Sequence, residues 1–167
     1  SGDNPEGLCV CNNKLYVANS GGLNYPNYGK TVSVIDLNSF TLLHTITVTE
    51  NPYFVQAYND RYVYLVSCGN YKEVPYTFQK IDAATDKVVR VFDEPVSNFT
   101  IYDHYAYRYY CPLDGSAPKI DVLDLNTDAV CNANFVKDGT AIQTPYGITV
   151  NPLNGDVYIL DVYNYSV

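Results

Sequence analysis

One thirteen-residue phrase occurs three times in this chain, and the spacing of its copies limits the possible folds more than any other feature. The copies are VIDLNSFTLLHTI (34–46), KIDAATDKVVRVF (80–92) and VLDLNTDAVCNAN (122–134). The aspartates in their opening turns are 46 and 42 residues apart: Asp36, Asp82 and Asp124. Periods between about 20 and 50 residues are typical of repeat architectures. The chain is therefore expected to consist of repeated structural units.

Two further elements recur at the same period. A segment with tyrosine as its second residue precedes each phrase and occurs once more later: LYVANSG (15–21), VYLVSCG (63–69), AYRYYCP (106–112) and VYILDVY (157–163). A third segment precedes each of those: GLCVCNN (7–13), YFVQAYND (53–60), NFTIYDH (98–104) and YGITVNP (146–152). Asn- and Asp-containing turns separate the segments, so each complete repeat is predicted to contain four short strands.

The repeated aspartates have a structural explanation. The last two strands of each repeat are joined by DLNS, DAAT or DLNT. An Asp that begins such a turn accepts a hydrogen bond from the backbone two residues further on and fixes the turn. We therefore interpret Asp36, Asp82 and Asp124 as turn residues and not as catalytic acids.

The strands also indicate how they pack. VYLV, VYIL and TLLHTI are apolar at adjacent positions, which predicts sheets buried on both faces. Four-stranded antiparallel sheets covered on both sides, at a period in the forties, are the blades of a β-propeller. The sequence predicts an all-β fold without helices, with three complete blades and a partial fourth in one domain over 1–167. The expected blade boundaries are about 5–50, 51–95, 96–143 and, for the partial blade, 144–167.

Particular segments resemble a known family. KLYVANSG, KTVSVIDLNSFTLLHTITVTENPYFVQAY and TPYGITVNPLNGDVYIL are similar to the YVTN-type β-propeller repeat. In that repeat a Tyr-Val-Thr-Asn-like strand is followed by a Val-Ser-Val-Ile-Asp strand and by an Asn-Pro that opens the next blade. The second and third repeats depart from it, with SCGNYKEVP and YYCPLDG in place of Asn-Ser-Gly. The resemblance implies a ring of about seven blades, of which this chain is about half.

The resemblance also implies a location and a second class of function. Members of the family are often secreted or surface-attached in bacteria, and Tyr- and Asn-rich versions resemble surface lipoproteins of Bacteroidetes-type bacteria. An extracytoplasmic home, at the bacterial cell surface or in the periplasm, is therefore expected, with any lipid anchor in a segment outside this one. The family's fold also resembles propeller hydrolases of the lactonase kind, which is the alternative to a non-catalytic role.

Composition excludes several partners. Eighteen acidic residues against ten basic ones give a net charge of −8, which argues against nucleic acid and anionic lipid. No apolar run approaches the ~20 residues of a membrane helix, so no membrane insertion is expected in this segment. The five cysteines lack zinc-site spacings, and Cys9 and Cys11, two apart in a predicted strand, point the same way and would make a poor disulfide. Small buried thiols are expected, with no metal and no cofactor.

Catalytic residues are not evident. The two histidines, His44 in a fourth strand and His104 in a turn, have no Ser or Cys partner at a recognisable spacing. The strand tyrosines Tyr16, Tyr64, Tyr107 and Tyr158 are expected to pack in the core. The sequence therefore favours a binding module or scaffold over an enzyme.

The candidate site lies on one rim. Connections between second and third strands are long (19–30, 67–77 and 110–118), whereas the opposite rim has tight turns. Long loops on a rigid scaffold are where binding residues concentrate, and Tyr beside Asn and Asp is typical of binding surfaces. We predict that these loops bind a glycan or a protein, unless the tyrosines merely pack the loops down. The predicted ligand-binding residues are Tyr25, Tyr28, Tyr71, Tyr76, Asn24, Asn70, Glu73 and Asp114.

The partial fourth repeat predicts an unpaired strand edge at residues 158–161. Exposed edges and apolar faces recruit partners. The fragment is therefore expected either to self-associate through this edge or to continue through more blades in a longer chain.

Overall fold

The computed structural model describes residues 1–136 and 138–162, which form strands, turns and one short 3-10 segment. The chain divides into two compact units, Ser1–Pro95 and Val96–Val167. They are called unit 1 and unit 2 and are described separately.

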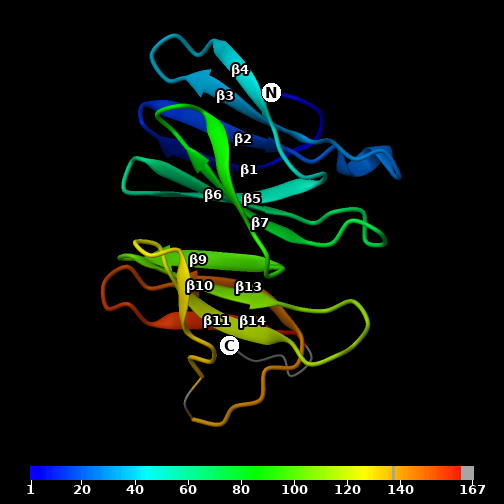
Figure 1. Cartoon of the computed structure of the whole chain (residues 1–167), viewed down its shortest axis with the longest axis vertical. Helices are drawn as coiled ribbons and strands as arrows, with labels where there is room; N and C mark the ends of the chain where they lie inside the picture. Colours follow the sequence, from blue (N-terminus) through cyan, green and yellow to red (C-terminus); the bar gives the residue numbers. More distant parts are fainter. Residues whose placement is uncertain (137, 163–167) are drawn as a thin grey trace. The chain divides into compact units, whose positions relative to one another are not determined.

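Unit 1 contains two four-stranded antiparallel sheets, each made from consecutive strands (Figure 1). The first sheet consists of β1 (Pro5–Cys11), β2 (Lys14–Asn19), β3 (Thr31–Asp36) and β4 (Leu42–Thr47). The second consists of β5 (Pro52–Tyr58), β6 (Tyr62–Ser67), β7 (Thr77–Asp82) and β8 (Lys87–Phe92). The 3-10 segment η1 (Gly22–Asn24) lies between β2 and β3.

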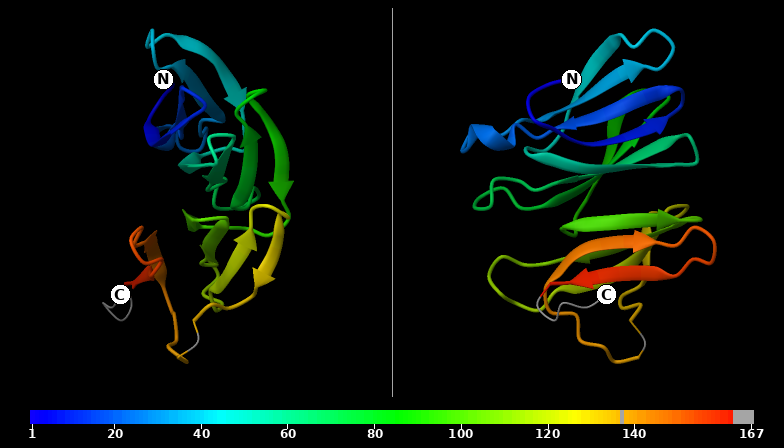
Figure 2. Two further views of the ribbon diagram at one scale, coloured as in Figure 1. Left: turned by 90° about the vertical axis from the view of Figure 1, so that its left-hand side faces the viewer. Right: turned by 180° about the vertical axis from the view of Figure 1, so that it is seen from behind.

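Unit 2 contains one four-stranded antiparallel sheet and a two-stranded hairpin. The sheet consists of β9 (Asn98–Tyr102), β10 (Tyr105–Tyr110), β11 (Lys119–Asp124) and β12 (Ala129–Asn132), and the hairpin of β13 (Pro145–Val150) and β14 (Val157–Asp161). A long connection joins the sheet to the hairpin (Figure 2). Three complete four-stranded sheets and a partial fourth are thus confirmed in the described part of the chain.

The turn interpretation of the repeated aspartates is confirmed. In each sheet the Asp carboxylate accepts a backbone N–H two residues on: Asn38 N to Asp36 at 2.9 Å, Ala84 N to Asp82 at 2.8 Å and Asn126 N to Asp124 at 2.8 Å. Each bond satisfies a donor in a tight turn and fixes where the next strand begins. Local sequence therefore sets the register of the outer strand.

Burial on both faces is confirmed for a central strand and is wrong for two others. Val63 to Val66 of β6 are all buried, whereas Leu42 and Leu43 of β4 are 55% and 49% exposed. The second sheet of unit 1 packs mainly along β1 and β2, so Leu42 and Leu43 at the far edge stay exposed, although His44 of β4 lies beside Asp86 of the second sheet. In β14, Tyr158 is 43% exposed although Ile159 is buried. That alternation is typical of a hairpin covered on one face.

The predicted burial of the strand tyrosines and of the cysteines is likewise confirmed for some residues and wrong for others. Tyr16 and Tyr64 are fully buried, as predicted, but Tyr107 is half-buried and Tyr158 is exposed. All five cysteines are free thiols. Cys11 and Cys68 are buried as expected, whereas Cys131 is exposed because β12 is an edge strand. Burial of the remaining core side chains contributes about 1.5–3 kcal/mol for each Val, Leu, Ile or Phe.

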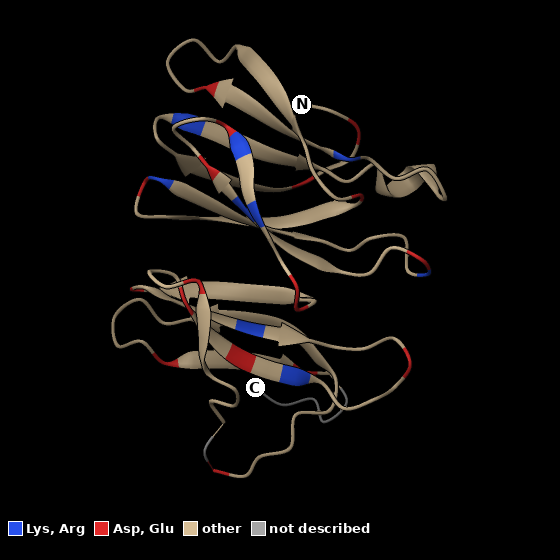
Figure 3. Cartoon of the chain, viewed as in Figure 1, with Lys and Arg blue, Asp and Glu red and all other residues tan. Residues whose placement is uncertain are grey.

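Charged residues are scattered over both units. Lys and Arg lie in strands and connections of both units, and the acidic residues lie mostly in connections (Figure 3). Within residues 1–136 and 138–162 there is no helix with the length and hydropathy needed to span a membrane.

Candidate functional site

The expected asymmetry between long and short connections is present in each complete sheet. The connections after β2, β6 and β10 cover 20–30, 68–76 and 111–118, whereas those after β1, β5 and β9 have two or three residues. In unit 1 the two long loops project from the same end of their sheets, the first in blue and the second in green (Figure 1). The three loops that the sequence predicts to carry the site are therefore the long connections of the structure.

Loops 20–30 and 68–76 are tied to each other through the segment that connects the two sheets. The Asn51 N–H donates to Gly29 O of the first loop at 2.7 Å, and the Cys68 N–H of the second loop donates to Asn51 O at 2.8 Å. One residue thus hydrogen-bonds to both loops. This arrangement ties the two loops to one connecting residue.

Two glycines allow the loop backbones to approach closely. A Cβ on Gly29 would collide with the Asn19 carbonyl oxygen, and one on Gly69 would collide with the Val74 carbonyl oxygen. Gly69 also has a φ of +64°, in the left-handed region that favours glycine. Both loops are therefore tightly folded.

The four predicted tyrosines form one continuous cluster, which we call the tyrosine cluster. Tyr25 and Tyr28 of the first loop have ring centroids 6.0 Å apart, Tyr28 and Tyr71 6.0 Å, and Tyr71 and Tyr76 of the second loop 6.1 Å. All three contacts are edge-to-face, with interplanar angles of 67°, 83° and 70°. Such contacts are favourable because the positive edge of one ring meets the negative face of the next.

The cluster has an exposed part and an anchored part. Tyr25 is 62% exposed and Tyr71 is 45% exposed, whereas Tyr28 and Tyr76 are half-buried. The Tyr71 hydroxyl accepts a hydrogen bond from Asn51 Nδ2 at 3.3 Å. Partial burial of this ring raises the pKa of Tyr71. The cluster therefore combines packing with presentation of aromatic surface to solvent.

Tyr71 also has a strained backbone. Its φ is +61°, in a region that bulky non-glycine residues rarely adopt and that costs of the order of 1–3 kcal/mol. The preceding Asn70 stabilises this loop, since its Oδ1 accepts backbone N–H bonds from Lys72, Glu73 and Val74 at 3.0, 2.9 and 2.9 Å. Asn70 therefore shapes the loop, and its carboxamide oxygen is already occupied.

The other predicted polar residues are placed differently. Asn24 and Glu73 are exposed beside the cluster, and Lys72 Nζ lies 6.0 Å from the Tyr25 ring centroid. Asp114 belongs to loop 111–118 of unit 2, where its carboxylate accepts the Ser116 N–H at 2.9 Å. Hydrogen bonds from Ser116 lower the pKa of Asp114. The structure brings together the four tyrosines, Asn24, Asn70 and Glu73, and it describes Asp114 only within unit 2.

Sequence reasoning missed two contributors. Cys68 lies beneath Tyr71 and Tyr76, and burial, the main cause, raises the pKa of its thiol to about 11. Glu50 is 9% exposed and pairs with Lys30 at 2.9 Å through Oε2. An alignment of the repeats places Cys68 at the position equivalent to Ser20, where each of these two long loops begins. No comparable sequence signal identifies Glu50.

The histidines do not join the cluster. His44 Nε2 in β4 lies 3.4 Å from Asp86 Oδ2, and His104 Nδ1 lies 2.8 Å from Asp103 Oδ2 in the β9–β10 turn. Among the residues that the structure describes, no three His, Cys, Asp or Glu side chains are grouped so that they could hold a metal ion.

Comparisons with known proteins inform the fold. No protein-family model matches the chain, and no curated protein sequence matches it. Solved structures do. A hydrazine synthase of Kuenenia stuttgartiensis has a TM-score of 0.66 at 17% identity over 86% of this chain, which spans 39% of the synthase chain. The dihydro-heme d1 dehydrogenase NirN in complex with DHE has a TM-score of 0.57 at 15% identity, over 75% of this chain and 26% of that one.

A smaller protein is similar over most of its length. The computationally designed Ika4 protein has a TM-score of 0.58 at 16% identity, over 94% of this chain and 90% of its own. These neighbours are β-propeller-type structures. The chain is thus an all-β protein of β-propeller type, with three complete blades and a partial fourth. At these identities the similarity defines the fold alone.

Proposed function

We propose that this chain is a non-catalytic binding module whose tyrosine cluster takes a glycan. The observation that carries the proposal is the continuity of the cluster: four rings from two loops of neighbouring sheets make three successive contacts of 6.0–6.1 Å. Loops that only needed to be packed down would not require Tyr25 to remain 62% exposed at the end of the series. We further propose, from the resemblance to YVTN-type repeats, one propeller domain located at a bacterial surface or in the periplasm.

A glycan suits this surface better than an extended protein segment. Sugar rings offer flat C–H faces with hydroxyl groups around their edge, and tyrosine offers a rigid apolar face with a polar tip. Asn24, Glu73 and Lys72 lie exposed around the rings as hydrogen-bonding groups. The tied loops preorganise these groups, so that little conformational entropy is lost on binding.

The experiment is a glycan-array screen followed by titration of the glycans retained. Tyr25→Ala is the sharpest variant because Tyr25 is the most exposed ring of the cluster, and its loss leaves the buried part of the loop in place. We expect affinity to fall about 10-fold or more, equivalent to ~1.4 kcal/mol, with little change in Tm. Tyr71→Ala with Tyr76→Ala should weaken binding at least as much.

The matched control is Tyr146→Ala, which removes a 71% exposed tyrosine from β13, outside the two loops. It should leave glycan affinity unchanged. If Tyr25→Ala binds as tightly as the unaltered protein, or if the cluster variants only lower Tm, the tyrosines are packing residues and the proposal is wrong. Retention of a protein ligand without any glycan would favour the protein-binding alternative.

A further inference from the structure

The protein places one of its own cations on the tyrosine cluster. Lys72 Nζ of loop 68–76 lies 6.0 Å from the centroid of the Tyr25 ring, which belongs to loop 20–30. This separation is within the range of cation–π attraction, in which the negative face of an aromatic ring attracts a positive charge. Tyr25 is also the most exposed ring of the cluster. The ring that a ligand reaches most easily is therefore suited to holding an ammonium group.

The charge around the cluster is negative. The two loops and the segments whose backbones hydrogen-bond to them cover residues 2–6, 20–30, 48–51 and 68–76. They carry four acids and two lysines, which leaves an excess of two negative charges: Asp3, Glu6, Glu50 and Glu73 against Lys30 and Lys72. Lys30 is paired with Glu50 at 2.9 Å. A cationic ligand is therefore attracted to these loops, and an anionic one is repelled.

Two of these acids lie where a ligand on the rings can meet them. Glu73 is exposed in loop 68–76. Glu6 of β1 is exposed as well, and its Oε1 accepts a hydrogen bond from the Ser20 hydroxyl at 3.4 Å. Burial is the main cause of the raised pKa of the Cys68 thiol, beneath the cluster, and the charge of Glu6 adds to it. The negative charge of Glu6 thus acts on the base of the cluster.

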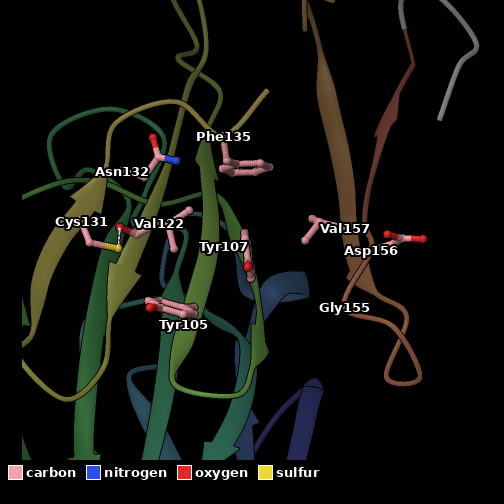
Figure 4. Close-up of a pocket in the computed structure, with 9 residues that line it drawn as sticks. All are labelled: Tyr105, Tyr107, Val122, Cys131, Asn132, Phe135, Gly155, Asp156 and Val157. Atoms are coloured by element: carbon pink, nitrogen blue, oxygen red, sulfur yellow. Dashed lines mark hydrogen bonds between the residues drawn. The ribbon is translucent and has the colours of Figure 1, made fainter. Parts of the chain in front are cut away.

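The groove in unit 2 shows that aromatic rings in this protein are not always accompanied by acids. This groove has a volume of about 740 Å³, and its Tyr107 and Phe135 rings meet edge-to-face with centroids 5.4 Å apart. The one charged residue among its described lining residues is Asp156, whose carboxylate points away from these rings (Figure 4). Asp156 Oδ2 accepts a hydrogen bond from Asn154 Nδ2 at 2.7 Å. The combination of rings, acids and a seated cation therefore distinguishes the tyrosine cluster.

We propose that the glycan bound by the tyrosine cluster carries protonated amino groups, as an oligosaccharide of glucosamine does. A sugar ammonium takes the place of the Lys72 ammonium on the Tyr25 ring, and Glu6 and Glu73 pair with ammonium groups around the rings. This inference rests on the glycan-binding function proposed above and names the chemical class of that glycan.

Other ligands match only part of this surface. An N-acetylated amino sugar keeps the flat ring faces that stack on tyrosine but has lost the positive charge. An acidic sugar would bring its carboxylate close to Glu6 and Glu73, and like charges at short distance repel. A lysine-rich peptide carries ammonium groups but lacks rigid sugar faces. Each of these differences can be measured with one probe.

The experiment is isothermal titration calorimetry with four probes of equal length. They are tetraglucosamine, its fully N-acetylated form, a tetramer of galacturonic acid, and tetralysine with both ends capped. The titrations are done at low salt and at about pH 6, where an amine comparable to an α-amino group is protonated. We expect tetraglucosamine to bind about 10-fold more tightly than each of the other three.

Substitutions at the cluster test the role of charge directly. Lys72→Met removes the competing ammonium and should tighten binding of tetraglucosamine about 3-fold, with little effect on the N-acetylated form. Glu73→Gln should weaken binding of tetraglucosamine about 3-fold and leave the N-acetylated form unaffected. Asp138→Asn is the matched control, because it removes one negative charge from an exposed acid of unit 2. It should change neither affinity.

The outcomes separate this inference from the function on which it rests. Equal affinities for tetraglucosamine and its N-acetylated form would overturn the inference and leave glycan binding in place. Tighter binding of the galacturonic acid tetramer or of tetralysine would overturn it, as would weaker binding of tetraglucosamine by Lys72→Met. Equal losses from Glu73→Gln and Asp138→Asn would show attraction by net charge alone and would also overturn it. Failure of every glycan to bind, on the array and in solution, would overturn both proposals.

Discussion

Three residues in equivalent turns share one backbone conformation but not one side chain. Phe40, Asp86 and Asp128 each occupy the fifth position of the DxxxΦ or DxxxD turn, with φ values of 53°, 52° and 55°. Asp tolerates the left-handed region because its short polar side chain bonds locally, whereas an aromatic residue does not. The backbone conformation of the turn is thus the same in all three sheets, whereas the side chain at its fifth position differs.

Phe40→Asn is expected to stabilise the protein. Phe40 is 74% exposed, so little packing is lost, and Asn adopts a positive φ with less strain than Phe. We expect the free energy of unfolding to rise by about 0.5–1 kcal/mol, measured by urea denaturation. Phe40→Ala is the control, since it removes the same ring without supplying a residue suited to this backbone. Equal effects of the two substitutions would contradict the explanation by strain.

Residue roles were predictable where the cause is local. The turn function of Asp36, Asp82 and Asp124 follows from contacts two residues away, and the structure confirms it. Exposure of Tyr158 and Cys131 was not predictable, because it depends on which other strands cover them. Sequence periodicity reports that a strand has apolar faces, but not whether a neighbour covers each face.

At the scale of elements, Asp86 in the β7–β8 turn joins the two sheets of unit 1, because its carboxylate accepts hydrogen bonds from Lys14 and Tyr16 of β2. Lys14 and Asp86 are 14% and 10% exposed, and removing one member of such a pair leaves the other poorly solvated. Asp86→Asn keeps the tolerance for a positive φ and removes only the charge. We expect it to lower the free energy of unfolding by about 1–3 kcal/mol in urea denaturation.

A double-mutant cycle isolates the contact between the sheets. Lys14→Met combined with Asp86→Asn should lower the free energy of unfolding by less than the sum of the two single changes. Each single variant leaves one charge unpaired, whereas the double variant leaves none. Asp138→Ala, an exposed acid in the β12–β13 connection, is the matched control and should have little effect. Additive losses would show that Asp86 acts only within its own turn.

The candidate site was predictable in part at this same scale. Loop length and composition identified both tyrosine-bearing loops and all four rings of the cluster. The edge-to-face order and the role of Asn51 in tying the loops together required the register between two sheets. Contacts between separate sheets depend on how their strands are aligned in space. The spacing of residues in a single sequence does not specify that alignment.

For the molecule as a whole, buried thiols predict loss of stability at alkaline pH. Burial raises the pKa of Cys9 to about 12 and those of Cys11 and Cys68 to about 11, from 9.0. Above pH 9 the unfolded chain releases these protons while the folded chain retains them, so the folded state binds more protons and stability falls as pH rises. The stabilisation is fully present below pH 9 and is lost as pH rises toward 11–12.

The measurement is the free energy of unfolding between pH 8 and 10.5, where each such thiol contributes a slope of up to ~1.4 kcal/mol per pH unit. Cys68→Ala should make the slope shallower than that of the unaltered protein, even if it lowers stability at neutral pH. Cys131→Ala serves as the control because Cys131 is exposed. A slope that Cys68→Ala leaves unchanged would exclude this thiol as a source of the pH dependence.

Every strand in the described sheets pairs only with its neighbours along the chain. A sheet therefore closes no connection longer than 11 residues when it forms, and the entropic barrier to its assembly is that of short turns and one loop of 8 to 11 residues. During synthesis, each sheet can form as soon as its fourth strand has left the ribosome, without waiting for residues still to be translated. The chain is then most prone to aggregation after one sheet has folded and before the next sheet has been synthesised, because the apolar face of the folded sheet is still exposed.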